Sequence, residues 1–553
     1  AGNARHPNYV LFCPQCRDLF ELTGKPERGE QLQCTRCEQS FENEPVARRN
    51  RYTCPDCGHE GRYPTELAKN GPPSHSLLCM EYHCPRCKPT HDGRFFKAAS
   101  DREFSLFAEA SRAFEDGAAR HWVPDDEIPE GDETTRLHRW GYQRYRELFN
   151  PRQLLSITTL CEEISRVPED TVRHALATVL SDCLRYQNML ARYDTYALKC
   201  QDIFAVHGYP VRLMQCENNV LGVDGAGSGG FRQVLDKYCA AKEYNEHPFE
   251  KKIEGKTKRR IAMSPERIEA SLLDRMPQET DERVAWLHCG SSESVPLSPN
   301  SVDAVVTDPP YYNNVQYAEL MDFCYIWLRQ LLNGDVPEFQ DASTRDESEL
   351  TGNKNAGRGI AHFTEGLSAV YQRAAEALKP EGLFAFTYHH NDVDAYVPLV
   401  VALCDAGLSV TATIPCPAEM SASLHISGTG SSVVDTIICA RRLKGPEKRV
   451  PASEEAPDTL AEELADQAQA LANGDVEVTE GDLRCMALGI LTGWSINALV
   501  GGWNKEADRD NGIKQARTRL VEYCEAASWE ETVKEVHARP RKKQELIAQS
   551  KLF

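Results

Sequence analysis

Long apolar runs and an excess of positive charge are both lacking in this sequence. No segment approaches the roughly 20 apolar residues that a membrane-spanning helix requires, and the first residues show no charged-then-apolar signal pattern. We therefore expect a cytoplasmic protein that does not contact a membrane. The formal net charge of −20 excludes a uniformly basic nucleic-acid binder. A local basic cluster, KKIEGKTKRR at 251–260, could still touch a phosphate backbone, the alternative being a solvated loop.

Cysteine is abundant instead, with 21 in the 553 residues. In a reducing compartment, cysteines are typical of metal ligands and buried thiols rather than of a disulfide framework. Four Cys-x2-Cys pairs lie near the N-terminus, and two such pairs can complete one tetrahedral zinc site. Pairing in sequence order predicts two structural Zn²⁺ sites, one formed by Cys13, Cys16, Cys34 and Cys37 and the other by Cys54, Cys57, Cys84 and Cys87. The alternatives are an interleaved pairing or the use of Cys79, His59 or His83.

Composition and apolar periodicity divide the chain into five regions. After the cysteine pairs come an acidic stretch, a segment with helical apolar spacing, a region of alternating strands and helices, and an acidic, Ala-rich C-terminal part. The predicted boundaries are 1–97 for tandem zinc ribbons, 98–150 for an acidic and helical linker, 151–280 for a helical region with Gly-rich and basic loops, 281–445 for an α/β domain and 446–553 for a C-terminal helical region.

The 281–445 region predicts an α/β fold. Strands are expected at 284–289, 302–307, 383–389, 408–414 and 432–441, with helices around 316–332, 364–378 and 393–406. Active sites in such sheets lie at the carboxyl ends of strands. Asp308 directly follows one of these strands, which makes it a candidate catalytic residue.

The residues after that strand are Asp308, Pro309, Pro310 and Tyr311. The exocyclic amine of a nucleobase is a poor nucleophile, because its lone pair is delocalised into the ring. The Asp308 carboxylate and the Pro309 carbonyl could accept its N–H groups, since two consecutive prolines fix the backbone with that carbonyl pointing outward. Tyr311, with Tyr312 as a second face, could stack on a base that has left the duplex. The pattern therefore predicts methyl transfer to a base amine, with these four residues as the catalytic loop.

This loop and its surroundings resemble the zinc-ribbon-containing adenine-specific DNA methylases of bacteria and archaea, which are DPPY amino-methyltransferases. The resemblance rests on DPPYYNNVQYAELMDFCYIWLR from residue 308, on GYQRYRELFNPRQLL at 141–155, on CLRYQNMLARYDTYALKCQDIF at 183–204 and on QCENN at 215–219. It implies a Rossmann-like methyltransferase sheet, S-adenosylmethionine as methyl donor, and adenine N6, or less often cytosine N4, of double-stranded DNA as target. It also implies a restriction or phage-defence system, with helicase or nuclease subunits as candidate partners.

The chain departs from that family in one respect. The family's cofactor loop, Asp-Pro-Phe-x-Gly-x-Gly, has only a superficial likeness here in VDGAGSGG at 223–230. We therefore expect only the second half of the sheet in this chain, with the cofactor-binding half supplied by a partner polypeptide or by an N-terminal portion outside it. The resemblance also implies that Cys289, Gly290 and Ser291, at the end of the strand 284–289, contact the adenine of the cofactor.

Other polar residues are predicted near the same edge of the sheet. They are Asn313 and Asn314 in the loop, Tyr388 and His389 at the end of the strand 383–389, and His425 and Ser427 between the last two strands. The asparagines could orient the base or only cap the loop, and the others could line the pocket. Two further functions stay open at this point: RNA base-amine methylation, and a non-enzymatic, zinc-dependent DNA-binding scaffold, which would have no need of Asp308.

Overall fold

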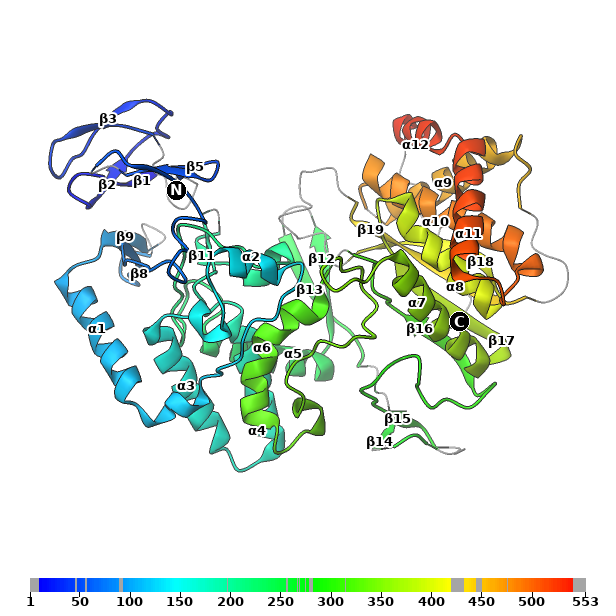
Figure 1. Cartoon of the computed structure of the whole chain (residues 1–553), viewed down its shortest axis with the longest axis horizontal. Coiled ribbons are helices and arrows are strands. Elements are labelled where there is room, and N and C mark those ends of the chain that lie inside the picture. The colour runs from blue at the N-terminus through cyan, green and yellow to red at the C-terminus, as the bar shows by residue number, and fades with distance from the viewer. Residues whose placement is uncertain are drawn as a thin grey trace. The chain divides into compact units, whose positions relative to one another are not determined.

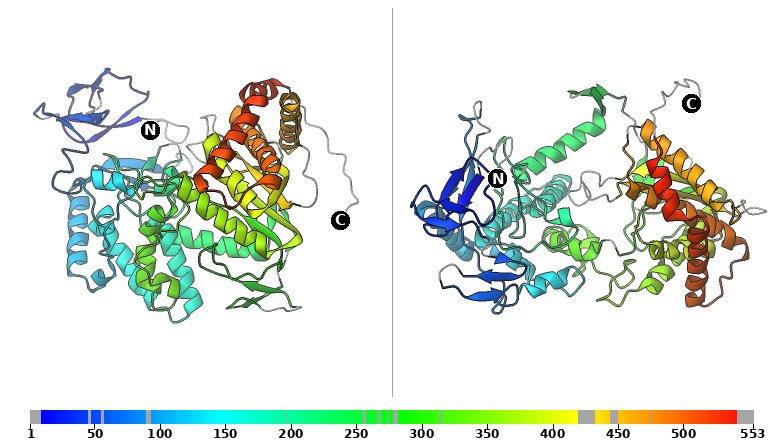
Figure 2. Two further views of the ribbon diagram at one scale, coloured as in Figure 1. Left: turned by 45° about the vertical axis from the view of Figure 1, so that its right-hand side comes forward. Right: turned by 90° about the horizontal axis from the view of Figure 1, so that it is seen from above.

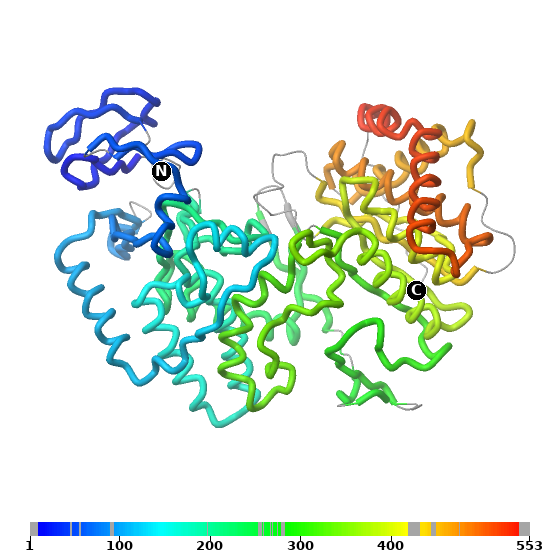
Figure 3. Tube along the Cα trace, viewed as in Figure 1, coloured from blue at the N-terminus to red at the C-terminus, as the bar shows by residue number. Residues whose placement is uncertain are grey.

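The computed structural model divides into two compact units (Figure 1). Unit 1 contains Ala1–Ile268 and Tyr317–Arg345, and unit 2 contains Glu269–Gln316 and Asp346–Phe553. Figure 3 follows the chain out of unit 1 and back into it for 317–345. The structure describes residues 9–44, 47–54, 57–88, 93–195, 197–254, 257–265, 267, 269–273, 275–277, 282–313, 315–418, 432–443, 450–474 and 476–540.

The N-terminal part of unit 1 consists of short antiparallel strands. The pairs are β1 (Tyr9–Phe12) with β2 (Leu19–Leu22), β3 (Gln31–Gln33) with β4 (Ser40–Glu42), and β8 (Cys79–His83) with β9 (Arg94–Ala98), while β5 (Ala47–Arg48), β6 (Arg51–Thr53) and β7 (Glu60–Arg62) form a three-stranded sheet. Such short strands bury little apolar surface. In the first ribbon, Phe20 packs with Cys13 and Cys34 in one small buried cluster, so its core includes its own cysteines.

The rest of unit 1 is mainly helical. Its helices are α1 (Asp101–Asp116), α2 (Thr134–Arg139), α3 (Pro151–Ser165), α4 (Asp170–Leu184), α5 (Phe231–Glu246) and α6 (Tyr317–Leu332). Asn150 caps α3, because its side chain accepts the Gln153 N–H at 2.9 Å. Phe149 contacts Phe323 and Trp327 of α6, with ring centroids 5.6 and 5.4 Å apart. Helix α6 therefore packs in this helical core, although it follows the Asp308 loop in the sequence.

The described residues also form two hairpins and several short 3₁₀ helices. The hairpins are β10 (Tyr193–Asp194) with β11 (Lys199–Cys200), and β12 (Phe249–Glu254) with β13 (Thr257–Ala262). The 3₁₀ helices are η1 (Ala118–Trp122), η2 (Tyr145–Leu148), η3 (Ile203–Val206) and η4 (Pro337–Phe339) in unit 1, and η5 (Val393–Tyr396) and η7 (Val500–Gly502) in unit 2.

Unit 2 is built on a four-stranded sheet with the order β16-β17-β19-β18. The strands are β16 (Val302–Thr307), β17 (Leu378–Tyr388), β18 (Leu408–Pro417) and β19 (Val434–Arg442), and the helices are α7 (Ile360–Ala377), α8 (Val397–Ala406), α9 (Ala456–Asn473), α10 (Glu480–Leu499), α11 (Arg509–Ala526) and α12 (Trp529–Ala538). β16 is parallel to β17, whereas β19 is antiparallel to both of its neighbours. The mixed α/β class predicted from the sequence is confirmed.

The two faces of this sheet differ. Helices α7, α8 and α10 pack against one face (Figure 1), where Phe384, Phe386 and Ile438 are buried. On the other face, Val306 is 77% exposed and Ile414 is 48% exposed. Within the described part of the chain, the outer edge of β16 pairs with no other strand. Asp308 therefore follows an edge strand whose second face is open.

The fifth predicted strand lies outside this sheet. β15 (Val284–Trp286) is parallel to β14 (Ser271–Leu273), and the two form a separate sheet. Each strand has three residues. β15 forms its hydrogen bonds with β14 and not with β16. The segment that leads from β15 to β16 is fixed to α7, because the Arg373 side chain donates to the carbonyls of Val295 (2.9 Å) and Leu297.

The C-terminal helices share the core of the four-stranded sheet. Helix α10 contacts β18 and β19, and its glycines allow this closeness, since a Cβ at Gly489 would lie 2.7 Å from Thr436. By length and composition, Glu480–Gly502 is the one described segment that could cross a membrane. However, 89% of its apolar window is buried inside the structure, as expected for the core helix of a soluble protein. A cytoplasmic location stays a prediction.

Candidate functional site

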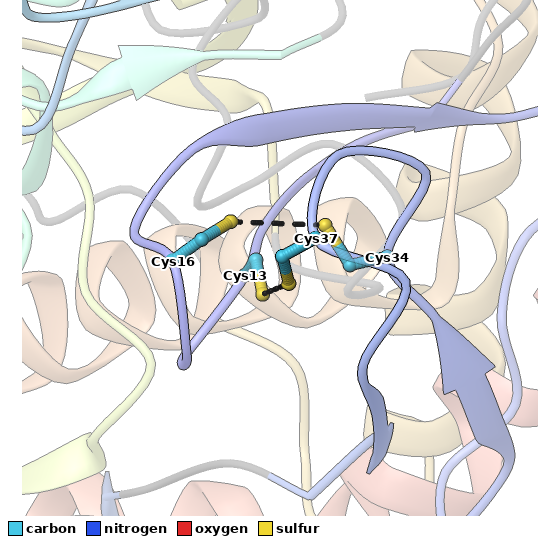
Figure 4. Close-up of side chains that lie close together, drawn as sticks. All are labelled: Cys13, Cys16, Cys34 and Cys37. Atoms are coloured by element: carbon cyan, nitrogen blue, oxygen red, sulfur yellow. Dashed lines mark hydrogen bonds between the residues drawn. The ribbon is translucent and has the colours of Figure 1, made fainter.

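Four cysteines of the first ribbon form a candidate metal centre. The Sγ atoms of Cys13, Cys16, Cys34 and Cys37 all lie within 4.8 Å of one another (Figure 4). The Sγ atom of Cys13 lies 3.8 Å from that of Cys37, and the Sγ atom of Cys16 lies 3.8 Å from that of Cys34. Burial raises the pKa of Cys34, but the backbone N–H groups of Cys37 and Arg36 outweigh this and lower it to about 7, which favours a thiolate. Four thiolates at this spacing are what tetrahedral Zn²⁺ takes as ligands.

The second predicted cysteine set is not assembled in the same way. The Cys54 N–H donates to the His59 carbonyl at 2.8 Å, and the Cys84 N–H donates to the Gly93 carbonyl at 2.7 Å. A hydrogen bond with the Cys87 thiol lowers the pKa of Cys84. Among the described residues, no second group of three metal-binding side chains comes together. The second site, at Cys54, Cys57, Cys84 and Cys87, stays a prediction.

Asp308 directly follows β16 and lies beside the last residues of β17. The strand register pairs Thr307 with Phe386, so that Asp308 and Thr387 follow side by side. The Thr387 hydroxyl donates to Asp308 Oδ1, and the Tyr311 hydroxyl donates to the same oxygen at 2.9 Å. Neither hydrogen bond uses Oδ2, and Asp308 is exposed. The second carboxylate oxygen can therefore accept a hydrogen bond from a ligand.

Both loop tyrosines have protein partners. The Tyr311 ring meets Tyr388 edge-on at 5.2 Å, and burial raises the pKa of its hydroxyl. Tyr312 has a φ of 48°, and its ring meets Phe363 edge-on at 5.3 Å. The Gly352 N–H donates to the Tyr312 carbonyl at 3.1 Å, and a Cβ at Gly352 would lie 2.8 Å from the Tyr312 ring. The loop is thus held in one conformation, while stacking of either ring on a base stays a prediction.

Two histidines follow β17 with opposite electrostatic environments. Burial of His389 disfavours its charged form, but hydrogen bonds with Asp435, at 3.3 Å from Nδ1, and with Cys485 outweigh this and raise its pKa to about 10. Burial lowers the pKa of His390, whose Nε2 lies 3.4 Å from Asn313 Oδ1. At neutral pH, His389 is therefore charged and His390 is neutral.

The residues predicted to contact the cofactor lie on an exposed loop after β15. Cys289, Gly290 and Ser291 are all exposed. Gly290 lies against the His288 ring, which stacks on Trp286 at a centroid distance of 4.8 Å. Exposed side chains on one loop do not enclose a molecule of the size of S-adenosylmethionine. These residues alone do not form a site for S-adenosylmethionine, and their contact with this cofactor stays a prediction.

The Gly-rich segment 223–230 belongs to unit 1, whereas Asp308 belongs to unit 2. The Gln233 side chain donates to the carbonyls of Val223 and Ala226, at 3.2 and 2.9 Å, and closes the segment on itself before α5. These two carbonyl groups are thus hydrogen-bonded within unit 1.

Tyr388 is buried and supports Tyr311 rather than facing solvent. Three other candidates lie outside the described residues, namely Asn314, His425 and Ser427.

Sequence reasoning does not find Thr387. A threonine in a strand is common, and this one lies 79 positions after Asp308 in the chain. The signal that could have found it is the parallel pairing of the strands 302–307 and 383–389, because the register of Thr307 with Phe386 places the next residue of each chain segment side by side.

Comparisons with protein families, with characterised proteins and with solved structures give no match to this chain. The functional assignment therefore depends on the residues and their geometry.

Proposed function

We propose that this chain is the catalytic-loop half of an S-adenosylmethionine-dependent, site-specific DNA methyltransferase that acts on adenine N6, within a restriction or phage-defence system. The observation that carries the proposal is the hydrogen bonding of the Asp308 carboxylate at the carboxyl end of β16. One of its oxygens is fixed by two protein hydroxyls, and the other is open to a ligand.

In this proposal each loop residue has a distinct role. Asp308 Oδ2 accepts one N–H of the target amine, and the Pro309 carbonyl accepts the other, which draws electron density towards the nitrogen. Thr387 and Tyr311 are positioning residues, because they hold the carboxylate through Oδ1. The amine becomes a better nucleophile as its lone pair is released from the ring.

S-adenosylmethionine, when bound, would supply an electrophilic methyl group. The exposed loop at Cys289, Gly290 and Ser291 is too open to hold the donor alone, so no transfer geometry follows from this chain's residues. The unpaired edge of β16 in the described part of the chain, and the exposed Val306 on this strand, support a partner polypeptide that adds strands at this edge, completes a Rossmann-like sheet and carries the rest of the donor site.

The decisive variant is Asp308→Ala, with Asp303→Ala as its control. Asp303 lies on β16, the strand that Asp308 follows, is exposed, and makes a surface ion pair with Lys379 at 2.8 Å. We expect Asp308→Ala to lower methyl transfer to duplex DNA by about 10²–10³-fold or more, because it removes a group that acts in the transition state. Asp303→Ala should leave transfer unchanged. Both are measured by methyl incorporation, with the chain alone and with the polypeptides encoded beside it.

Two results would contradict the proposal. One is full transfer by Asp308→Ala under conditions in which the unmodified chain is active. The other is the absence of S-adenosylmethionine binding, measured by calorimetry, both for the chain alone and for every reconstituted complex. Binding only in a complex would establish a split enzyme.

A further inference from the structure

The densest basic cluster of the sequence is a two-stranded ribbon. β12 and β13 are antiparallel, and their register places Lys251 opposite Arg260 and Lys252 opposite Arg259. Neighbouring residues of a strand point to opposite faces, so each face of the ribbon carries one of these pairs. All four side chains are exposed. The hairpin follows α5 directly and lies at the end of that helix (Figure 2, right).

These cross-strand pairs are unfavourable for the hairpin itself. Like charges directly opposite one another destabilise an antiparallel pair. The ribbon is instead supported by aromatic contacts at its base. The Arg260 guanidinium carbon makes a cation–π contact 4.3 Å from the centroid of the Phe249 ring, and Tyr244 of α5 meets Phe249 edge-on at 5.2 Å. The concentration of positive charge, in a chain with a net charge of −20, indicates an anionic ligand.

The shape of the ribbon favours duplex DNA over other polyanions. The major groove of B-DNA is about 12 Å wide and admits a two-stranded β-ribbon. A ribbon that enters edge-on turns one basic face towards each phosphate-lined wall. The major groove of an RNA duplex is too narrow and deep for this.

We infer that the β12–β13 hairpin is a DNA-binding arm that enters the major groove and contacts phosphates on both walls through Lys251, Lys252, Arg259 and Arg260. This inference rests on the proposed function in taking DNA as substrate, but it concerns binding alone. In this inference the hairpin attracts the DNA electrostatically and positions the protein on the duplex. It takes no part in methyl transfer.

The test is binding of a short fluorescent DNA duplex by the full chain carrying Lys251→Glu and Lys252→Glu. This double substitution puts glutamates opposite Arg260 and Arg259, so the hairpin gains two unlike pairs and should stay folded. We expect DNA affinity to fall at least about tenfold, and the slope of log Kd against log salt concentration to fall by about 2, since each phosphate contact contributes about 0.9.

The matched control carries Lys514→Glu and Lys534→Glu, two exposed lysines of α11 and α12. It makes the same change in net charge and should leave both affinity and salt slope unchanged. The conservative variant Lys251→Arg with Lys252→Arg should also bind as the unmodified chain does, because it keeps both charges.

Several outcomes would overturn the inference. They are equal losses in the hairpin variant and the control, an unchanged salt slope in the hairpin variant, failure of the unmodified chain to bind duplex DNA at low salt, and tighter binding of an RNA duplex than of a DNA duplex. Asp308→Ala separates this inference from the proposed function. If that variant keeps methyl transfer while the hairpin variant loses DNA affinity, the proposed function fails and the DNA-binding arm stands.

Discussion

The four-cysteine cluster and the Asp308 site are assembled in different ways. The cluster takes its ligands from two tight turns within Cys13–Cys37, and the ribbon around it has little other core. The Asp308 site takes Thr387 from a strand 79 positions away and depends on a sheet with one extensively buried face. We therefore expect the first site, with metal bound, to stabilise the fold around it, and the second to be held by a fold that does not depend on it.

This difference predicts how each region responds to the substitution of one of its residues. Loss of one cysteine should unfold its surroundings, because thiolate ligands in small ribbons contribute folding free energy directly. Loss of one polar group beside Asp308 should change activity and leave stability almost unchanged, since Asp308 is exposed.

The largest expected effect is that of Cys34→Ser. Structural zinc contributes about 10–16 kcal/mol of apparent binding free energy in small zinc domains, so the ribbon should lose both its metal and its fold. Elemental analysis should show one zinc fewer per chain, and hydrogen exchange should show loss of protection confined to the first ribbon. The control is Cys239→Ser, an exposed cysteine of α5. Full zinc content and unchanged protection in Cys34→Ser would contradict the structural role.

A smaller effect is expected from Thr387→Val. The variant removes one of the two hydroxyls on Asp308 Oδ1 and keeps the shape of the side chain. We expect methyl transfer to fall about tenfold, the equivalent of one hydrogen bond of about 1.4 kcal/mol, with no change in thermal stability. Thr411→Val, at an exposed position of β18, serves as control. Equal losses in both variants would show that the effect is not specific to Asp308.

The His389–Asp435 pair gives a prediction on stability alone. The folded-state pKa of His389 is raised to about 10, above its ordinary value of about 6.5. The pair therefore stabilises unit 2 fully below pH 6.5, and this contribution is lost as the pH rises towards 10. Asp435→Asn should lower the free energy of unfolding by about 1–3 kcal/mol at pH 6 and by much less at pH 10. Denaturant titrations at both pH values measure this.

Asp394→Asn is the control for that series, because Asp394 makes an exposed ion pair with Arg517 at 3.0 Å. Its effect should be small and similar at both pH values. A constant difference between Asp435→Asn and the unmodified protein across the pH range would argue against a charged His389.

The smallest expected effect is that of Lys379→Ala. Its ion pair with Asp303 is on the surface, with side chains 45% and 84% exposed. Such pairs contribute about 0–1 kcal/mol, and added salt should remove even this difference. A larger loss of unfolding free energy would show that the start of β16, around Asp303, is more rigid than the exposure of Asp303 indicates.

The parts of the molecule that local pattern specifies could be predicted from sequence. The Cys-x2-Cys spacing locates Cys13, Cys16, Cys34 and Cys37, because each turn brings two thiols together within four residues. The strand 302–307 and the helix after it are read from apolar periodicity and agree with β16 and α6 within a residue or two. The position of Asp308 at a strand end follows from the same pattern.

The parts of the molecule that depend on long-range packing could not be predicted from the sequence. Nothing local indicates that α6 joins unit 1 while Asp308 stays in unit 2, because its apolar face would suit either core. The pairing of β15 with β14 depends on a competition between strands that periodicity does not describe. The partnership of Thr387 with Asp308 depends on strand register, which a one-residue slip would abolish.

The exposed edge of β16 has a practical consequence for anyone who prepares this chain. Among the described residues nothing pairs with this edge, and a strand with Val306 at 77% exposure is a template on which other polypeptides, including further copies of the same chain, can add a strand. Overproduced without a companion that covers this edge, the chain should aggregate in a concentration-dependent way. A charged residue in place of Val306 should increase its solubility.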